Sequence, residues 1–380
     1  MRPIERPRLL ALIPELLRSR VTLVVAPVGS GKSTLLRQWM LALEPQADLL
    51  PISWRVEHNS PSSLRAEIAR AASAAVPQLQ WNPPDQPSGA DLASFSAAVS
   101  SHERRRPDVP IVIVLDDVHV LTDPSVLGML GAAIELLPDD VRFVIASDAP
   151  VPLLLARRRL THDVLELGAA ELAFDDGELA AAVGDARARL AREVTGGWAA
   201  AVGAVIALSD PLDLVRHYVR DELVRGLTPQ TRTALLETAV LPEIDPGVAD
   251  LLRGTDDTAS ALDELTARGR HPTKYESVWR HPPVVRQALA ELLAEESPQR
   301  SAELMTRVAE LETAPLSLSS RELEVLAQLD SDAAITAIAE SLSISYHTAR
   351  THVRSIYAKL GVSSRAGAVR RARDAGLLAP

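Results

Sequence analysis

The sequence predicts an α/β domain with a parallel sheet, followed by an all-α region and a small basic helical domain at the C-terminus. Three observations predict this order. Five apolar runs alternate with Ala- and Leu-rich helical stretches before about residue 170, and the strand pattern fades after that point. Beyond residue 344, seven Lys and Arg side chains stand against one acid. Near-continuous apolar runs are typical of parallel strands that helices cover on both faces.

The five apolar runs are the expected strands, and their alternation with helices is the pattern of a doubly wound sheet. The expected strands are residues 21–28, 49–56, 110–117, 141–147 and 163–168. The helices expected among them include residues 63–76 and 126–137, and the proline-rich residues 81–91 are expected to form a surface loop.

Length and composition limit the class of protein. A chain of 380 residues corresponds to two to four domains. The absence of cysteine excludes disulfides and Cys-ligated metal sites and suits a reducing, cytoplasmic location. The longest apolar run, residues 198–208, is far shorter than the ~20 residues of a membrane span, so no membrane partner is expected. The N-terminal stretch, with its internal acids and prolines, does not resemble a signal peptide.

Charge is unevenly distributed along the chain. The formal net charge is −10, which argues against a chain that coats nucleic acid over its whole surface. The last 36 residues nevertheless carry +6, which leaves −16 for the preceding 344. A basic terminus on an acidic body indicates a local contact with a polyanion.

The stretch APVGSGKS follows the first expected strand and precedes a helix, as in the P-loop pattern of nucleoside-triphosphate-binding proteins. Gly29 and Gly31 allow backbone N–H groups to turn toward phosphate oxygens, and the helix N-terminus adds a favourable dipole. Lys32 is expected to reach the β- and γ-phosphates, and the Ser33 hydroxyl to bind Mg²⁺. The expected phosphate-binding residues are Ala26, Gly29, Ser30, Gly31, Lys32, Ser33 and Thr34.

An acidic pair ends the third expected strand, in the stretch IVIVLDD. Asp116 is expected to hold the Mg²⁺ ion, and Asp117 to polarise the attacking water as the catalytic residue. A strand-terminal turn or helix cap is the alternative interpretation of this pair. Its occurrence about 80 residues after the P-loop favours the magnesium site.

Three consecutive arginines, residues 157–159, allow two interpretations. One is a solvated charged face. The other is a sensor contact from Arg157 to the γ-phosphate, made within its own chain or from a neighbouring copy.

The basic C-terminal block has the pattern of a helix-turn-helix. Residues 320–329 are expected to form a helix with Ser320 as N-cap and with Leu323 and Leu326 at helical spacing. A helix, a turn and a longer helix ending at Gly361 are expected next. One face of this last helix is apolar, with Ala349, Val353, Ile356, Tyr357 and Leu360.

The other face of the same helix is polar and basic, as major-groove recognition requires. Arginine can bind guanine with two hydrogen bonds, threonine can contact a thymine methyl, and lysine and hydroxyls can hold phosphates. A small helical bundle with a solvated basic face is the alternative. The expected DNA-binding residues are Thr348, Arg350, Thr351, Arg354 and Lys359.

Residues 320–378 resemble the LuxR-type helix-turn-helix in the stretches SRELEVL, IAESLSIS and RTHVRSIYAKLGVSSRAGAV. This resemblance implies that Thr348, Arg350, Thr351 and Arg354 face DNA. It also places Lys359 and Arg365 in the KLxVxxR stretch of the family. The chain departs from the usual family pattern at Asp332, Ala337 and Ala349.

The preceding part resembles the MalT-like ATPase regulators of the STAND class, through RPRLL, VVAPVGSGKSTLL, VLDDVH, LLLARRRL and VTGGWAAAV. The resemblance implies ATP or ADP as the nucleotide, Mg²⁺ as its metal ion, and a contact from His281 to the bound nucleotide; a surface or turn histidine is the alternative. Two differences from the family stand out. Asp148 takes the place of an arginine that senses the γ-phosphate, and the long helical-repeat sensor between the ATPase and DNA-binding parts is missing.

The expected organisation is an ATPase domain at 1–170, a helical subdomain at 171–215 and a winged-helix-like region at 216–311. A linker at 312–319 and the helix-turn-helix domain at 320–380 follow. This order indicates a cytoplasmic, ATP-dependent DNA-binding transcriptional regulator, in which nucleotide state controls self-association and binding to double-stranded promoter DNA. It would be at most a slow regulatory ATPase and a homo-oligomer on DNA, with RNA polymerase as a partner if it activates.

Two other classes stay open at this point. One is a regulator that binds DNA without nucleotide and keeps a degenerate ATPase scaffold. The other is a motor or loader ATPase that tracks along DNA, against which the acidic body and the specific-looking recognition helix argue.

Overall fold

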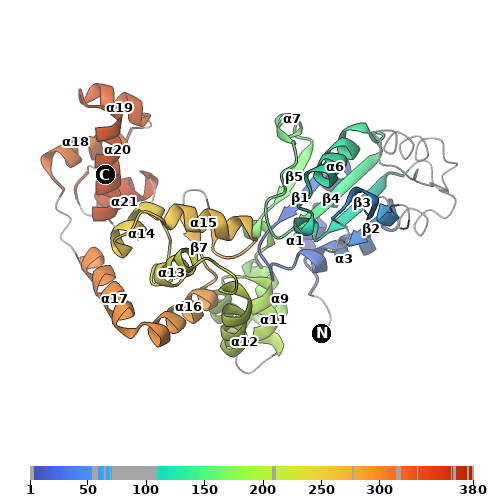
Figure 1. The fold of residues 1–380 in the computed structure, drawn as a ribbon, viewed down its shortest axis with the longest axis horizontal. Helices are drawn as coiled ribbons and strands as arrows, with labels where there is room; N and C mark the ends of the chain where they lie inside the picture. The colour runs from blue at the N-terminus through green and yellow to red at the C-terminus, as the bar shows by residue number, and fades with distance from the viewer. Residues whose placement is uncertain are drawn as a thin grey trace. The chain divides into compact units, whose positions relative to one another are not determined.

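The structure is a computed structural model, and Figure 1 shows the chain as a ribbon. It describes residues 4–53, 59–63, 66–68, 70, 109–207, 211–275, 278–313, 318–331, 333–360, 362, 365–374 and 376–378. The chain divides into two compact units, of which the first holds Met1–Ser209 and Thr266–Arg270 and the second holds Asp210–Leu265 and His271–Pro380.

The first unit is built on a parallel five-stranded sheet in the order β2-β3-β4-β1-β5. Its strands are β1 (Val21–Val25), β2 (Asp48–Ser53), β3 (Ile111–Asp116), β4 (Val141–Ser147) and β5 (Val164–Leu167). The predicted parallel sheet is therefore confirmed, with all five strands in their expected places. Pro51 is compatible with the ladder because β2 lies at the edge of this sheet, where a missing N–H costs little.

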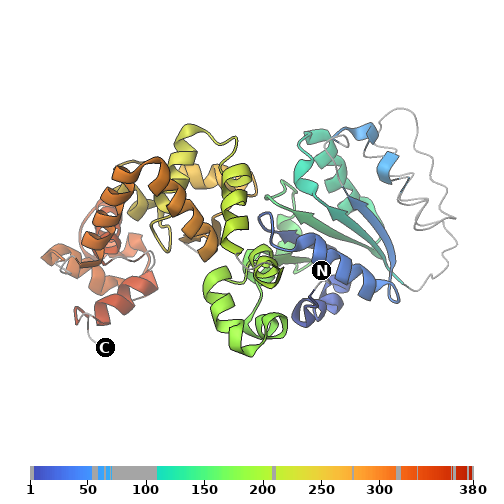
Figure 2. The same cartoon turned by 90° about the horizontal axis from the view of Figure 1, so that it is seen from below.

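Helices cover both faces of the sheet, and alternate strand residues point to the two layers (Figures 1 and 2). Ile113 and Phe143 pack with α6 (Pro124–Leu136) in one core, whereas Val114 and Val144 pack with α1 (Pro7–Leu10), α2 (Ile13–Arg18) and α3 (Lys32–Leu43) in the other. Burial on both sides explains why the strands read as continuous apolar runs.

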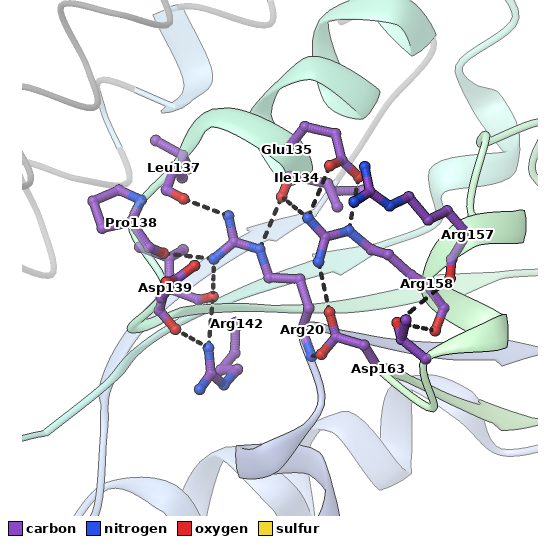
Figure 3. A network of polar contacts seen from close by, with 12 residues as sticks. Arg20, Ile134, Glu135, Leu137, Pro138, Asp139, Arg142, Arg157, Arg158 and Asp163 are labelled. Atoms are coloured by element: carbon purple, nitrogen blue, oxygen red, sulfur yellow. Dashed lines mark hydrogen bonds and ion pairs between the residues drawn. The ribbon is translucent and has the colours of Figure 1, made fainter.

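A buried arginine, Arg20, lies at the end of the sheet where the parallel strands begin (Figure 3). The Arg20 guanidinium, just before β1, donates to the carbonyl oxygens of Ile134 (2.8 Å), Leu137 (2.7 Å) and Val141 (2.6 Å). A cation at this point satisfies carbonyl groups that the last turn of α6 leaves unpaired. This network fixes α6 against the start of β4.

The remaining elements of the first unit follow β3 and β5. They are η2 (Val118–Val120), α7 (Ala156–Leu160), α8 (Ala169–Leu172), α9 (Asp176–Val183), α10 (Asp185–Thr195) and α11 (Ala199–Ala207). Arg6 ties the N-terminal segment to these helices, because its guanidinium donates to Leu172 O (2.6 Å) and pairs with buried Glu178 at 2.7 Å. The same guanidinium stacks on the Phe174 ring.

Among its residues that the structure describes, the second unit is helical apart from a short antiparallel hairpin, β6 (Thr273–Tyr275) and β7 (Val278–Arg280). Sequence patterns missed this hairpin because three-residue strands are too short to show a period. The helices around it are α12 (Pro211–Tyr218), the π-helical η3 (Val219–Leu223), α13 (Pro229–Thr238), α14 (Pro246–Arg253), α15 (Thr258–Ala267), α16 (Pro283–Glu296) and α17 (Pro298–Thr313).

Four helices form the C-terminal domain: α18 (Ser320–Leu329), α19 (Ile335–Ser341), α20 (Tyr346–Leu360) and α21 (Arg365–Asp374). The N-cap of α18 is Ser319 rather than the expected Ser320, because the Ser319 hydroxyl and the Glu322 carboxylate form a capping box. Leu323 is exposed, and the buried face of α18 is set instead by Val325, Leu326 and Leu329.

Several sequence expectations lie wholly or partly outside the described residues. They are the last three residues of the expected strand 49–56, the loop at 81–91, most of the helix at 63–76, the middle of the linker at 312–319, and the positions of Asp332 and Gly361. Among the residues that are described, no helix combines the length and apolarity that crossing a bilayer requires.

Candidate nucleotide and DNA sites

The P-loop joins the end of β1 to the start of α3, and its geometry suits a phosphate group. Gly29 (φ +79°) and Gly31 (φ +88°) both lie in the left-handed region that favours glycine. The first turn of α3 has no side-chain cap, so its N–H groups are available to an anion. Lys32 is buried in this turn, and its ammonium donates to Ala26 O (2.7 Å) and Pro27 O (3.2 Å).

A tryptophan from the helical subdomain packs against the P-loop. The Trp198 indole N–H donates to Val28 O at 3.3 Å, and the Ala200 N–H donates to Gly29 O at 2.9 Å. A Cβ on Gly29 would come within 2.7 Å of the Trp198 ring, closer than real Cβ contacts. Glycine is therefore required at position 29 both by the backbone conformation and by the lack of space for a Cβ. The contacts of Trp198 and Ala200, from the stretch VTGGWAAAV, hold the loop in this conformation.

The acidic pair lies where the sequence predicted, at the end of β3. Asp116 is the last residue of the strand, and Asp117 follows with a φ of +59°, unusual for a residue with a side chain. Burial raises the pKa of Asp117, and the charges of Asp116 and Asp148 raise it further, while His119 and Lys32 act in the opposite direction. A carboxylate whose pKa is raised toward neutrality is a better general base.

Asp148 follows β4, which lies between β1 and β3 in the sheet. Because the carboxyl ends of parallel strands share one edge, Asp148 stands between the P-loop lysine and the acidic pair. Its Oδ1 lies 2.5 Å from the Lys32 Nζ, and its Oδ2 lies 3.5 Å from the His119 Nε2. The structure thus brings Lys32, Asp117, His119 and Asp148 together.

Arg157 lies elsewhere in the unit. It belongs to α7 and lies near Glu135, at the end of the sheet where the strands begin (Figure 3). A hydrogen bond from Arg158 is the main reason for the lowered pKa of Glu135, and the charge of Arg157 acts in the same direction. The P-loop lies at the other end of the strands, after the C-terminus of β1. A contact from Arg157 to the γ-phosphate of its own chain does not fit this placement, which leaves the contact to a neighbouring copy as the prediction. Arg158 and Arg159 form ion pairs with Glu135, Asp163 and Glu166.

His281 follows β7 in the second unit and is 6% exposed. Neither of its ring nitrogens has a hydrogen-bond partner among the residues that the structure describes. Burial lowers its pKa well below the ordinary value, and the charges of His271 and Arg286 act in the same direction. The side chain is therefore held neutral, and its contact with a nucleotide stays a prediction.

The expected DNA-facing side chains lie on the exposed face of α20. Thr348, Arg350, Thr351 and Arg354 are all exposed, whereas Ala349 is buried and Val353, Ile356 and Leu360 lie in the core of the C-terminal domain. The amphipathic division of this helix is therefore confirmed, with Tyr357 partly buried. The Thr351 hydroxyl donates to His347 O at 2.9 Å, which turns its hydrogen inward.

Lys359 has a partner inside the domain. Its ammonium pairs at 2.7 Å with Glu322 of α18, a carboxylate whose side chain is 5% exposed. Glu322 also accepts hydrogen bonds from the Ser355 hydroxyl (2.6 Å) and the Ser319 N–H (2.7 Å). Lys359 thus ties the recognition helix to the first helix of the domain, and its contact with DNA stays a prediction.

The residues of the first unit fit a magnesium–nucleotide complex. The two glycines hold the loop in the left-handed backbone conformation that a P-loop requires, and α3 presents N–H groups without a side-chain cap at its N-terminus. Ser33 and Asp116 supply the hydroxyl and carboxylate oxygens that Mg²⁺ prefers. The fold and site thus define a P-loop ATPase joined to a winged-helix region and a helix-turn-helix.

Comparison with known families gives these parts their names. Residues 17–163 match the AAA domain, residues 220–301 the MalT winged helix domain, and residues 316–372 the bacterial regulatory proteins of the luxR family. The resemblance to MalT-like, LuxR-type regulators is confirmed, and the chain carries their ATPase, winged-helix and DNA-binding domains in that order.

Curated relatives agree with this order. The chain is 27% identical over 293 residues to the HTH-type transcriptional regulator MalT of Yersinia enterocolitica, covering 70% of this chain and 32% of the relative. It is 26% identical over 281 residues to the serine/threonine-protein kinase PknK of Mycobacterium tuberculosis, covering 66% and 25%. The chain thus spans about a quarter to a third of the length of these relatives.

Solved structures give a weaker likeness. A STAND protein with a tetratricopeptide repeat sensor from Pyrococcus horikoshii matches 98% of this chain and 58% of its own, at 13% identity and a TM-score of 0.37. Cdc6p from Pyrobaculum aerophilum matches 78% and 95%, at 18% identity and a TM-score of 0.37. Scores this low carry no conclusion about function.

Sequence reasoning missed three contributors to the P-loop environment: Trp198, His119 and Gly269. Gly269 lies between α15 and β6, and its carbonyl accepts the Val28 N–H at 3.4 Å. None of the three carries a spacing that links it to the P-loop, although two belong to the stretches VLDDVH and VTGGWAAAV.

Proposed function

We propose that the protein is an ATP-dependent, DNA-binding transcriptional regulator whose nucleotide state controls self-association and promoter binding. The proposal rests on the presence, in one chain, of a P-loop at the N-terminus of α3 and of a LuxR-type domain whose helix α20 has an exposed basic face. An ATPase domain joined to a DNA-binding domain has a regulatory role if the bound nucleotide changes the affinity of that domain for DNA.

Lys32, Gly29 and Gly31 would hold the phosphates, and Ser33 and Asp116 would hold the magnesium ion. Mg²⁺, when bound, neutralises phosphate charge. Asp117, with its raised pKa, would accept a proton from water in a slow hydrolysis that resets the switch.

Self-association would place two basic helices on half-sites about one helical turn apart on double-stranded promoter DNA. A neighbouring copy would also be the source of an Arg157 contact, and RNA polymerase would be the partner of an activator.

The experiment is a footprint of the purified chain on its operator, with ADP and then with MgATP, for the natural protein and Lys32→Ala. We expect ATP to raise operator affinity of the natural protein at least about tenfold, equivalent to ~1.4 kcal/mol of coupling. Lys32→Ala should lose this response, because the buried ammonium is the only side-chain cation of the loop.

Arg37→Ala is the matched control, because Arg37 is an exposed cation on the same helix. Thermal melting of both variants separates lost binding from lost folding. If the footprint of Lys32→Ala responds to ATP as the natural protein does, the nucleotide switch is wrong.

One observation favours a second candidate function, a regulator that binds DNA without using nucleotide. The Lys32 ammonium is already paired with Asp148, at 2.5 Å. In that case no nucleotide would bind, and the footprint would be identical with ADP, with ATP and without either.

A further inference from the structure

The hydrogen-bonding capacity of Lys32 is fully used. A lysine ammonium has three N–H donors and no acceptor. In the structure these meet Ala26 O at 2.7 Å, Pro27 O at 3.2 Å and the Asp148 carboxylate at 2.5 Å. The two carbonyls belong to the P-loop itself, so Asp148 is the only charged acceptor of the three. A phosphate that binds Lys32 has to share the ammonium with this carboxylate or displace it.

Asp148 is held firmly in this position. Gly269 (φ +64°) packs against its main chain so closely that a Cβ on Gly269 would lie 2.5 Å from the Asp148 Cβ. The Nε2 atom of His119 lies 3.5 Å from Oδ2, the other carboxylate oxygen of Asp148. The Asp148 side chain is 15% exposed, which limits the water available to screen its charge.

Negative charge is concentrated around the single cation. Asp117, after the end of β3, interacts with both Asp116 and Asp148, and Lys32 is the neighbouring cation of Asp117 and of Asp148. In P-loop proteins the β-phosphate lies against the glycine-rich loop and the N-terminus of the helix that follows it, which is α3 in this chain. The γ-phosphate extends beyond it, toward the magnesium-binding acid and the attacking water, which is the side of these carboxylates.

We propose that Asp148 sets the nucleotide specificity of the site: its carboxylate competes with the γ-phosphate for Lys32, so a nucleoside diphosphate binds more tightly than the triphosphate. The inference rests on the proposed nucleotide-binding function. It goes further in naming one residue that opposes the triphosphate and leaves the diphosphate largely unaffected. The main-chain N–H groups of the P-loop and of the first turn of α3, which are the other donors for the β-phosphate, do not involve Asp148.

The experiment measures binding of MgADP and of the magnesium complex of β,γ-imido ATP to the full chain by titration calorimetry. For the natural protein we expect ADP to bind at least about tenfold more tightly. Asp148→Asn keeps the size and hydrogen-bonding oxygen of the side chain and removes its charge. It should raise the affinity for the ATP analogue about tenfold or more, and change that for ADP by less than about threefold.

Asp139→Asn is the matched control, because Asp139 is an exposed aspartate just before β4, at the opposite end of the strand that precedes Asp148. It makes the same chemical change in the same domain and should alter neither affinity. The nucleotide preference of the natural protein needs no variant, so the proposal can be tested even if Asp148→Asn fails to fold.

The outcomes separate the two proposals. Equal affinities of the natural protein for the two nucleotides, or an equal gain for both in Asp148→Asn, overturn the role of Asp148 and leave the proposed function standing. Binding of neither nucleotide by any of the three proteins overturns the proposed function, and this inference with it. ADP preference in the natural protein that Asp148→Asn reduces supports the inference.

Discussion

The P-loop site and the outer face of α20 both gather charge, but in opposite surroundings. At the P-loop one buried lysine, with its side chain 7% exposed, interacts with carboxylates that follow two strands, Asp117 after β3 and Asp148 after β4. On α20, Arg350 and Arg354 stand exposed on a single helix. The first site depends on the fold to bring its residues together, and the second depends only on helical spacing.

Burial determines how each site uses its charge. Two charges at close range interact several times more strongly beneath a protein surface than in bulk water, so a single carboxylate can decide which phosphate the P-loop accepts. Exposed arginines are screened by salt and act through their number and their base contacts. We therefore expect single changes at the P-loop to have large effects and changes on α20 to have graded ones.

The largest effect is expected for Gly29→Ala. The left-handed backbone at Gly29 and the approach of its Cβ site to Trp198 together predict a loss of about 2–5 kcal/mol in unfolding free energy. Nucleotide binding should be lost as well, since the loop has to move away from its phosphate-binding shape. Urea unfolding and calorimetric titration with MgADP measure the two effects.

Gly203→Ala is the control for this change. Gly203 lies within α11, has ordinary helical backbone and has nothing within 4 Å of an added Cβ. Alanine there should stabilise the chain by about 0.5–1 kcal/mol and leave nucleotide binding intact. If both glycine variants behave alike, the packing of Trp198 on the loop does not constrain Gly29.

The contrast between the two sites also explains what could be predicted from the sequence. The P-loop motif, the acidic pair and the amphipathic α20 lie in contiguous stretches, where spacing alone determines geometry, and their placement was predicted correctly. Asp148 was noticed as a departure from a family pattern, but its ion pair with Lys32 depends on β4 lying between β1 and β3. Strand order is a property of the fold, and the sequence does not display it.

One expectation was wrong where two neighbouring side chains could serve the same purpose: Ser319 rather than Ser320 caps α18, because the Glu322 carboxylate closes the capping box. Lys359 pairs with the same carboxylate, and its contact with DNA stays a prediction. Arg157 lies in α7, and the position of α7 beside the sheet depends on how the chain returns from β4 to β5. Its contact with the nucleotide of a neighbouring copy stays a prediction. Propensity rules do not decide among such alternatives, whereas packing does.

The second prediction concerns Glu322, which is more deeply buried than the partly buried acids near the P-loop and has hydrogen-bond partners on both carboxylate oxygens. Burial alone would raise its pKa, but hydrogen bonds from Lys359, Ser355 and Ser319 outweigh it and hold the pKa at about 2. A pKa below the unfolded value stabilises the fold above pH ~4.5, and this contribution is lost as the pH falls from there toward 2. At about 1.4 kcal/mol per pKa unit, the shift from 4.5 to about 2 contributes at most ~3.5 kcal/mol at neutral pH.

Glu322→Gln should therefore destabilise the C-terminal domain by about 1–3 kcal/mol at pH 7. Hydrogen exchange of α20 amides in the full chain measures this locally, and the difference from the natural protein should shrink as the pH is lowered to 4. Glu324→Gln removes an exposed ion pair with Arg321 on the same helix and should cost under ~0.5 kcal/mol. A difference that is independent of pH would contradict the role of the Glu322 charge.

The smallest expected effect, and the one that tests the exposed site, is that of Arg350→Ala. If Arg350 binds a base, its loss costs about 1–3 kcal/mol on the operator and much less on random DNA, so the specificity ratio falls. Arg189→Ala, which removes an exposed cation of α10 in the other unit, should change neither affinity. Competition binding at fixed salt measures both. Equal losses on operator and random DNA would identify Arg350 as a phosphate contact, because a phosphate looks the same in every sequence whereas a guanine edge does not.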